Sequence, residues 1–211
     1  MIPQPTRDPY NVALGALRRF ADEGRFEPGG ALVVTELAAE VGLSATPVRE
    51  ALACLAGEGL IDRKRGRGYF YPLLSATEIV DLYELQRAYL HAALTLHYGG
   101  AQALQRAAAR SADGAAIDAF YEALLDQTGN TALAAAHGRV SARLAAAVRI
   151  ESEIAEAAAL LDDMVSAAAE ARLQDLQALI SVHHDRRCAL ARHIAATLQS
   201  GGPTARTLEA R

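Results

Sequence analysis

The stretch Thr35-Glu-Leu-Ala-Ala-Glu-Val-Gly-Leu-Ser-Ala-Thr-Pro-Val-Arg-Glu-Ala-Leu52 decides the fold of the first third of this chain. Leu37 and Val41 stand four residues apart, so they share one face of a short helix. Gly42 allows a sharp turn after this helix, because glycine adopts left-handed backbone conformations without strain. The stretch therefore predicts two short helices joined by a tight turn.

The second of these helices has two distinct faces. Ser44 or Thr46 can cap it, and Pro47 is tolerated in its opening turn, where backbone N–H groups lack helical partners. Apolar side chains recur at i, i+4 and i+7 and predict the buried face, which comprises Val48, Leu52 and Leu55. The opposite face, where a recognition helix meets the major groove of DNA, comprises Thr46, Arg49 and Ala53.

A basic hairpin is predicted directly after this helix. Residues 60–63 and 68–71 have the pattern of two short antiparallel strands, and Gly66 and Gly68 permit a tight turn between them. A charge run by itself is more often a solvated surface. Its position after a helix-turn-helix favours a wing that contacts phosphates or enters the minor groove. The cations that crowd the turn are Arg63, Lys64, Arg65 and Arg67.

These residues resemble the DNA-binding domain of GntR-superfamily regulators. The resemblance covers residues 10–72 and rests on Gly24-Arg-Phe-Glu-Pro-Gly29, Thr46-Pro-Val-Arg-Glu-Ala-Leu52 and Glu58-Gly59-Leu60. It implies that Thr46 and Arg49 contact phosphates and base edges, and that Gly66 sits at the wing tip near the minor groove. The full set of DNA-contacting residues that it implies is Thr35, Ser44, Ala45, Thr46, Arg49, Arg63, Lys64, Arg65, Gly66 and Arg67.

One position departs from this family. Where the family usually has an arginine after Ser44, this chain has Ala45. An arginine there commonly binds guanine through two hydrogen bonds, a contact worth ~1–3 kcal/mol of discrimination. Its replacement predicts an altered operator sequence or weaker binding.

The composition supports two domains. The chain has 211 residues, of which 51% are hydrophobic, and carries a net charge of −4. Residues 1–72 hold nine basic and nine acidic side chains, whereas residues 73–211 hold twelve and sixteen, so the acidity belongs to the second domain. No apolar run is long enough to cross a bilayer and the amino terminus shows no secretory signal. A cytoplasmic protein with reduced Cys54 and Cys188 is therefore expected.

The second part of the chain predicts an all-α bundle. Ser75-Ala-Thr-Glu78 is a capping box that opens a helix running to about Tyr98, in which Ile79, Leu82, Leu85 and Tyr89 keep the helical period. Breaks over residues 111–114, 128–130 and 170–172 suggest about six helices, the last spanning roughly 172–199. The predicted fold class is mostly α. It comprises a winged helix-turn-helix domain (8–72), a helical effector-binding and dimerisation domain (76–199) and a flexible tail (200–211).

This second domain resembles the FCD or VanR-like helical domain of the FadR subfamily of GntR regulators. The resemblance rests on Asp81-Leu-Tyr-Glu-Leu-Gln-Arg-Ala-Tyr-Leu90 and on Phe120-Tyr-Glu-Ala-Leu-Leu125 followed by Gly129-Asn130. Many such domains hold a divalent metal with one aspartate and three histidines and sense small organic acids through it. Here Ile117 and Tyr121 stand at two ligand positions, the segment 159–163 lacks the third, and His183 matches the fourth.

No metal cofactor is therefore expected by the family's scheme. The resemblance implies instead a metal-free effector pocket with polar contacts from Gln86, Arg87, Tyr121 and His183. Two alternatives stay open: these residues are ordinary packing residues, or a different divalent metal site forms among His91, His97, His137, His183, His184, His193 and Asp185.

The combined prediction is a dimeric transcriptional regulator. Two winged domains would bind a palindromic double-stranded DNA operator, and the family resemblance implies a repressor released by a metabolite, either an organic acid or a larger apolar molecule. Contact with a membrane is not expected. One alternative is a helical domain that only dimerises. An all-α enzyme is the other, although the sequence has no nucleophile elbow, phosphate loop or zinc-protease helix.

Overall fold

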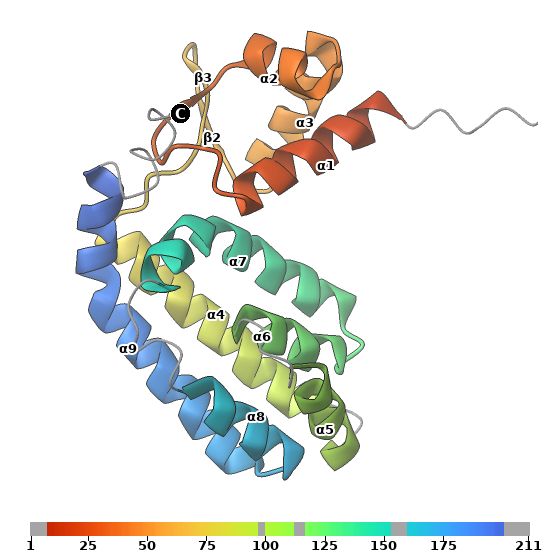
Figure 1. Cartoon of the computed structure of the whole chain (residues 1–211), viewed down its shortest axis with the longest axis vertical. Coiled ribbons are helices and arrows are strands. Elements are labelled where there is room, and N and C mark those ends of the chain that lie inside the picture. Colours follow the sequence, from red (N-terminus) through yellow and green to blue (C-terminus); the bar gives the residue numbers. More distant parts are fainter. Residues whose placement is uncertain (1–7, 97–99, 112–116, 153–159, 201–211) are drawn as a thin grey trace, which may run out of the picture. The chain divides into compact units, whose positions relative to one another are not determined.

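The computed structural model describes residues 8–96, 100–111, 117–152 and 160–200, and these divide into two compact units. One unit comprises the chain up to Leu73 together with the end from Leu198, and the other is Leu74–Thr197 (Figure 1). None of the described helices is both long and apolar enough to cross a membrane. The predicted tail lies outside the described residues from 201 onward, as does the lead-in 1–7.

The first unit is a winged helix-turn-helix. Helix α1 (Pro9–Asp22) begins with Asp8, whose side chain accepts a hydrogen bond from the backbone N–H of Tyr10, and it packs against α3. Helix α2 (Val34–Val41) ends at Gly42, where φ is 69°, and α3 (Ala45–Gly57) follows after three residues. The left-handed backbone at Gly42 confirms the turn predicted there.

The wing contains one strand more than the sequence predicted. Strands β2 (Asp62–Lys64) and β3 (Gly68–Phe70) form the expected antiparallel hairpin, and β1 (Ala31–Leu32) pairs with the other side of β3. The sheet order is therefore β1-β3-β2. With only two residues, β1 is too short to show an alternating pattern, so the prediction of a two-stranded wing was incomplete.

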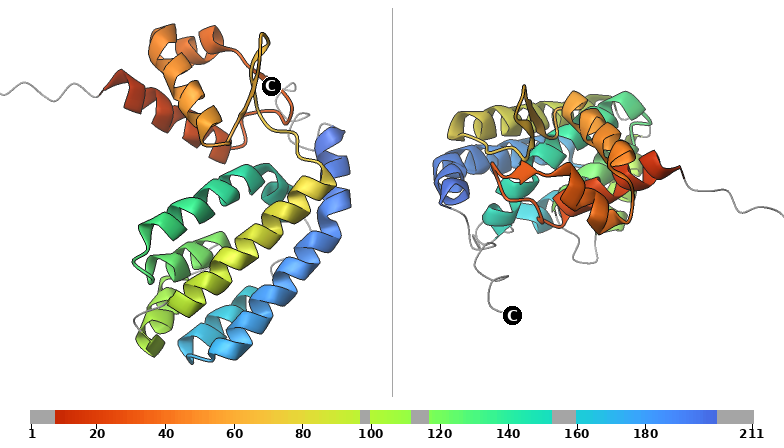
Figure 2. Two further views of the ribbon diagram at one scale, coloured as in Figure 1. Left: turned by 180° about the vertical axis from the view of Figure 1, so that it is seen from behind. Right: turned by 90° about the horizontal axis from the view of Figure 1, so that it is seen from above.

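The second unit is a helical bundle. Its described helices are α4 (Ala76–Leu96), α5 (Gly100–Ser111), α6 (Ile117–Asp126), α7 (Thr131–Ser152), α8 (Leu161–Ala169) and α9 (Leu173–Gln199). Helix α4 lies in the middle of this unit, with α7 along one side and α9 along the other (Figures 1 and 2). Ser75 and Glu78 form the predicted capping box, with Glu78 accepting from the Ser75 N–H at 2.9 Å and from its hydroxyl at 2.7 Å.

The residues that keep the helical period on α4 do not all lie on its buried face. Leu85 is 41% exposed, whereas Tyr83, Gln86 and Leu90 are fully buried beside Ile79. A spacing of three residues drifts backward by about 60° at each step, so Leu85 lies about 120° from Ile79 around the helix. The predicted helix is confirmed, and its buried face includes the polar residue Gln86.

Candidate nucleic-acid interface and the centre of the helical unit

The exposed face of α3 carries the side chains that were predicted to meet DNA. Thr46, Arg49 and Ala53 are exposed, whereas Val48, Leu52 and Leu55 are buried, as the periodicity predicted. Arg49 has no ion pair within the described part of the chain, so its guanidinium is available to an outside partner.

Three further residues predicted to contact DNA lie at the starts of α2 and α3. Ser44 occupies the N-cap position of α3, but its side chain makes no capping hydrogen bond, so the capping role predicted for it is wrong. Its hydroxyl is thereby left exposed, and Ala45 beside it is half-buried. Thr35 is exposed near the start of α2, where backbone N–H groups favour an anionic partner.

The wing tip presents its cations to solvent. Arg63, Lys64, Arg65 and Arg67 are all exposed, and the turn is closed by a hydrogen bond from the Arg67 N–H to the Lys64 carbonyl at 2.9 Å. Gly66 has φ of 73°, and a Cβ built there meets nothing within 4 Å, so the backbone conformation rather than space calls for glycine.

Two aromatic rings lie under these cations. The Arg63 guanidinium carbon is 6.0 Å from the Tyr69 ring centroid, and Lys64 Nζ is 4.4 Å from that of Phe70. Neighbouring residues of a strand face opposite sides, so the two rings steady cations on both faces of the hairpin. This arrangement suits a hairpin that lies against a phosphate backbone.

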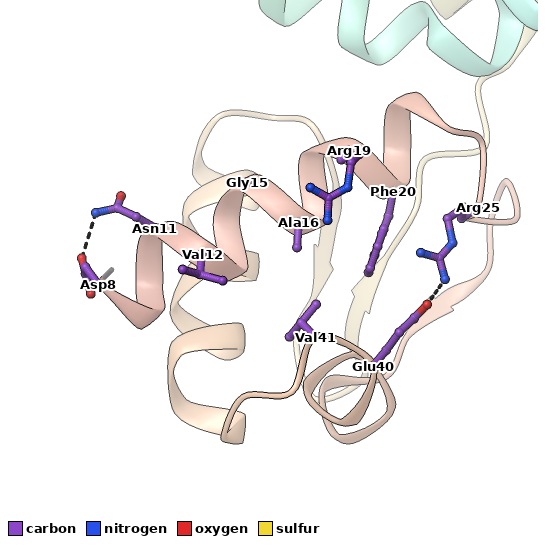
Figure 3. A pocket seen from close by; sticks show the side chains of 10 residues that line it. All are labelled: Asp8, Asn11, Val12, Gly15, Ala16, Arg19, Phe20, Arg25, Glu40 and Val41. Carbon is purple, nitrogen blue, oxygen red and sulfur yellow. Dashed lines mark hydrogen bonds and ion pairs between the residues drawn. The ribbon is translucent and has the colours of Figure 1, made fainter. Parts of the chain in front are cut away.

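Other arginines of this unit are paired internally. Arg18 donates to both carboxylate oxygens of Glu58, at 2.8 and 2.7 Å, and Arg25 forms an ion pair with Glu40. The Arg25–Glu40 pair borders a shallow hollow of about 860 Å³ between α1 and α2 (Figure 3). None of the residues predicted to contact DNA lines this hollow, so the unpaired basic surface remains the face of α3 and the wing.

In the helical unit, three of the four predicted effector residues meet in the core. Tyr121 Oη and His183 Nδ1 lie 2.8 Å apart, and both residues are buried. Gln86 joins them through His184, whose Nε2 is 3.3 Å from Gln86 Oε1 and whose ring stacks on Tyr121. Arg87 instead forms an ion pair with the exposed Asp185 at 2.7 Å, so it does not belong to this group.

Sequence reasoning missed the residue at the centre of this group, Arg187. Its side chain is 1% exposed; Nε donates to Glu151 Oε2 at 2.9 Å and Nη1 donates to Gln86 Oε1 at 2.8 Å. The guanidinium carbon also lies 4.3 Å from the ring centroid of Tyr83, whose hydroxyl donates to Glu151 at 3.1 Å. A signal existed, because His183 and Arg187 fall within the helical stripe formed by Leu176, Ile180, Ala191 and Ile194.

Burial disfavours the charged form of the core histidines. It lowers the pKa of His137 to about 4 and the pKa of both His183 and His184 to about 3, and the charge of Arg187 adds to each shift. Arg187 and Glu151 form the buried ion pair of this centre, and the imidazoles pack around it.

The described residues offer no group of three or more His, Cys, Asp and Glu side chains that could hold a metal ion. His183 is engaged by Tyr121, and His91 Nε2 lies 3.2 Å from the Ser181 hydroxyl. His97 lies outside the described residues. The absence of a metal cofactor therefore stays a prediction.

Comparison with known proteins places the first unit in a family. The family model "Bacterial regulatory proteins, gntR family" matches residues 9–70. Residues 9–70 thus match a gntR-family domain. The Nta operon transcriptional regulator of Aminobacter aminovorans is 45% identical over 65 residues, which are 31% of this chain and 30% of that protein. An HTH-type regulator of Streptomyces ambofaciens is 43% identical over 72 residues, 34% of this chain and 30% of that protein.

The gntR-family domain thus spans about a third of these relatives, and the matched model ends before the helical unit begins. The similarity to solved structures covers more of this chain than the family model does. A GntR transcriptional regulator from Rhodococcus sp. RHA1 superposes with a TM-score of 0.71 over 86% of this chain and 96% of that one, at 18% identity. E. coli McbR/YncC superposes with a TM-score of 0.65 over 89% of this chain and 99% of that one, at 16% identity. These likenesses show a shared fold over most of this chain.

Proposed function

We propose that this chain is a sequence-specific DNA-binding transcriptional regulator and not an enzyme. The observation that carries the proposal is the exposed, unpaired Arg49 on α3 beside a wing of four exposed cations, within a gntR-family domain. Several relatives of this domain are named as transcriptional regulators, which supports the same function. Such a protein would act in the cytoplasm, where it meets the chromosome.

We further propose that it binds as a homodimer to a palindromic operator. One α3 helix reaches only a few base pairs of the major groove, so a second copy related by two-fold symmetry would supply the specificity that a single copy lacks. The helical unit would provide the dimer contact and an effector site around Gln86, Tyr121 and His183. This arrangement matches the FadR-subfamily resemblance and a metabolite-responsive repressor.

Arg49→Ala tests the DNA-binding role. In vitro selection from random DNA with the purified full chain yields the operator, and footprinting then compares variants on it. We expect Arg49→Ala to lower affinity at least about fivefold, in line with the loss of a base contact worth about 1–3 kcal/mol. Arg192→Ala, which removes an exposed arginine from α9, is the matched control and should bind as the parent does. A normal footprint from the Arg49 variant would refute the assignment of α3 as the recognition helix.

A further inference from the structure

Helix α3 carries a second charged side chain on the face that was predicted to meet DNA. Glu50 is exposed and directly follows Arg49, and the residues predicted to contact DNA did not include it. It stands four residues after Thr46 and three before Ala53, so the helical period places it on the face that these exposed residues share. Within α3, Thr46, Arg49 and Glu50 are the exposed residues whose side chains carry N–H groups or oxygens that can hydrogen-bond to a base.

The carboxylate of Glu50 is not balanced by a cation of its own helix. No ion pair joins it to another residue in the described part of the chain. Arg49 is adjacent in sequence, but its side chain leaves the helix about 100° away. The residues one helical turn away in either direction have no positive charge, and they are Thr46, Pro47, Ala53 and Cys54.

Two other acidic residues of the first unit hold its elements together. Glu58, at the C-cap of α3, accepts from Arg18 of α1 with both carboxylate oxygens, at 2.8 and 2.7 Å. Glu40 of α2 forms an ion pair with Arg25. Glu50 has no comparable contact within the described chain, so its charge is available to a partner outside the protein.

An unbalanced carboxylate on this face opposes DNA binding in general. Phosphates line the groove that a recognition helix enters, and a like charge near them lowers the affinity for every sequence. An ionised carboxylate only accepts hydrogen bonds. The repulsion is therefore offset only where the edge of a base presents a donor to Glu50.

The chemistry of the major groove selects the base. Guanine presents two acceptors there, and thymine presents an acceptor and a methyl group. Adenine presents its amino donor beside the acceptor N7, which would face the second oxygen of a carboxylate. Cytosine presents its N4 amino group as a donor without an acceptor on its own edge, so it is the base that suits Glu50.

We propose that Glu50 is a specificity-determining residue, which accepts a hydrogen bond from the N4 amino group of a cytosine in each half of the operator. The proposal rests on the DNA-binding function proposed above and names one base that the operator contains. The carboxylate acts in two ways. It binds the cytosine, and it repels sequences that present an acceptor at the same position.

In vitro selection with the full chain and with the variants Glu50→Ala and Glu50→Gln tests the assigned base. We expect the parent to select a cytosine at one position in each half of the operator, and both variants to lose this preference. Discrimination between the operator and one with thymine at this position should fall at least about fivefold in Glu50→Ala. Glu122→Gln, which removes an exposed carboxylate from α6, is the matched control and should select the parent's operator.

Binding to unrelated DNA separates base recognition from a structural role. Because Glu50→Ala removes a charge that the phosphates repel, it should bind unrelated DNA more tightly than the parent at low salt. Its melting temperature should stay as in the parent, since the side chain is exposed and makes no contact that holds the fold. A variant that binds operator and unrelated DNA more weakly alike, or that melts earlier, would overturn the proposal in favour of a structural role.

The failure of this inference is distinguishable from failure of the proposed function. An operator that is selected equally by the parent and by Glu50→Ala, but is lost in Arg49→Ala, would reject the role of Glu50 and leave the regulator intact. A preference for adenine at the position that depends on Glu50 would overturn the assigned base. A parent chain that selects no sequence would reject the proposed function and this inference together.

Discussion

At the scale of single residues, the buried pair of Arg187 and Glu151 has the largest consequence for stability. Their side chains are 1% and 5% exposed. Arg187→Met leaves Glu151 charged and unpaired in the core, so we expect the free energy of unfolding to fall by about 3–5 kcal/mol. Urea denaturation followed by circular dichroism measures the loss. Arg186→Met, on the exposed side of the same helix, is the control and should change stability by less than about 0.5 kcal/mol.

The double variant Arg187→Met with Glu151→Leu separates charge burial from packing. Removing both charges should recover most of the stability lost in Arg187→Met, because no unpaired carboxylate remains. A double variant as unstable as the single one would mean that the guanidinium acts mainly through packing against Tyr83 and Gln86.

At the scale of elements, the cations of the wing predict how the affinity for DNA depends on salt concentration. Replacing Arg63, Arg65 and Arg67 together by glutamine should weaken binding to all DNA sequences alike. The slope of log K against log salt should become shallower by about 0.9 for each arginine that contacts a phosphate. Binding titrations between 50 and 300 mM salt measure the slope, and Arg110→Gln in the helical unit is the control. An unchanged slope would show that the wing does not touch phosphates.

The elements also show what a sequence can predict. The two faces of α3, the capping box at Ser75 and the extent of α9 follow from local periodicity and capping chemistry, and all three were confirmed. Strand β1 could not be predicted, because its two residues become a strand only by pairing with distant β3. The break between α7 and α8 carried no glycine or proline signal, and residues 153–159 there lie outside the described chain.

The candidate effector site was predictable only in part, because it forms through contacts between residues that are far apart in the sequence. Family correspondence suggested Gln86, Tyr121 and His183, which do meet in the core. The helical stripe of α9 could have placed Arg187 on the buried face, but its partners on α4 depend on the register between the two helices, which the sequence does not show. The structure settles that register through the Arg87–Asp185 and Gln86–Arg187 contacts.

At the scale of the whole molecule, the buried histidines make stability depend on pH. Their pKa values, about 4 for His137 and about 3 for His183 and His184, lie below the value of 6.5 expected in the unfolded chain. Between pH 6.5 and about 4 the unfolded chain therefore binds more protons than the folded one. Folding stability is fully present above pH 6.5 and falls as the pH falls through this window. Asp118 has the opposite effect on stability, because burial raises its pKa and acidification then favours the folded chain. Its single contribution is smaller than that of the three histidines together.

We accordingly expect the melting temperature of the full chain to drop between pH 7.5 and pH 5. The free energy of unfolding should fall by up to about 1.4 kcal/mol per pH unit for each buried histidine, since one pKa unit corresponds to that energy. His137→Asn removes one titrating group and should flatten the pH dependence, whereas His193→Gln, on the exposed side of α9, should leave it as it is. A melting temperature that holds constant or rises on acidification would contradict the lowered pKa values of these imidazoles.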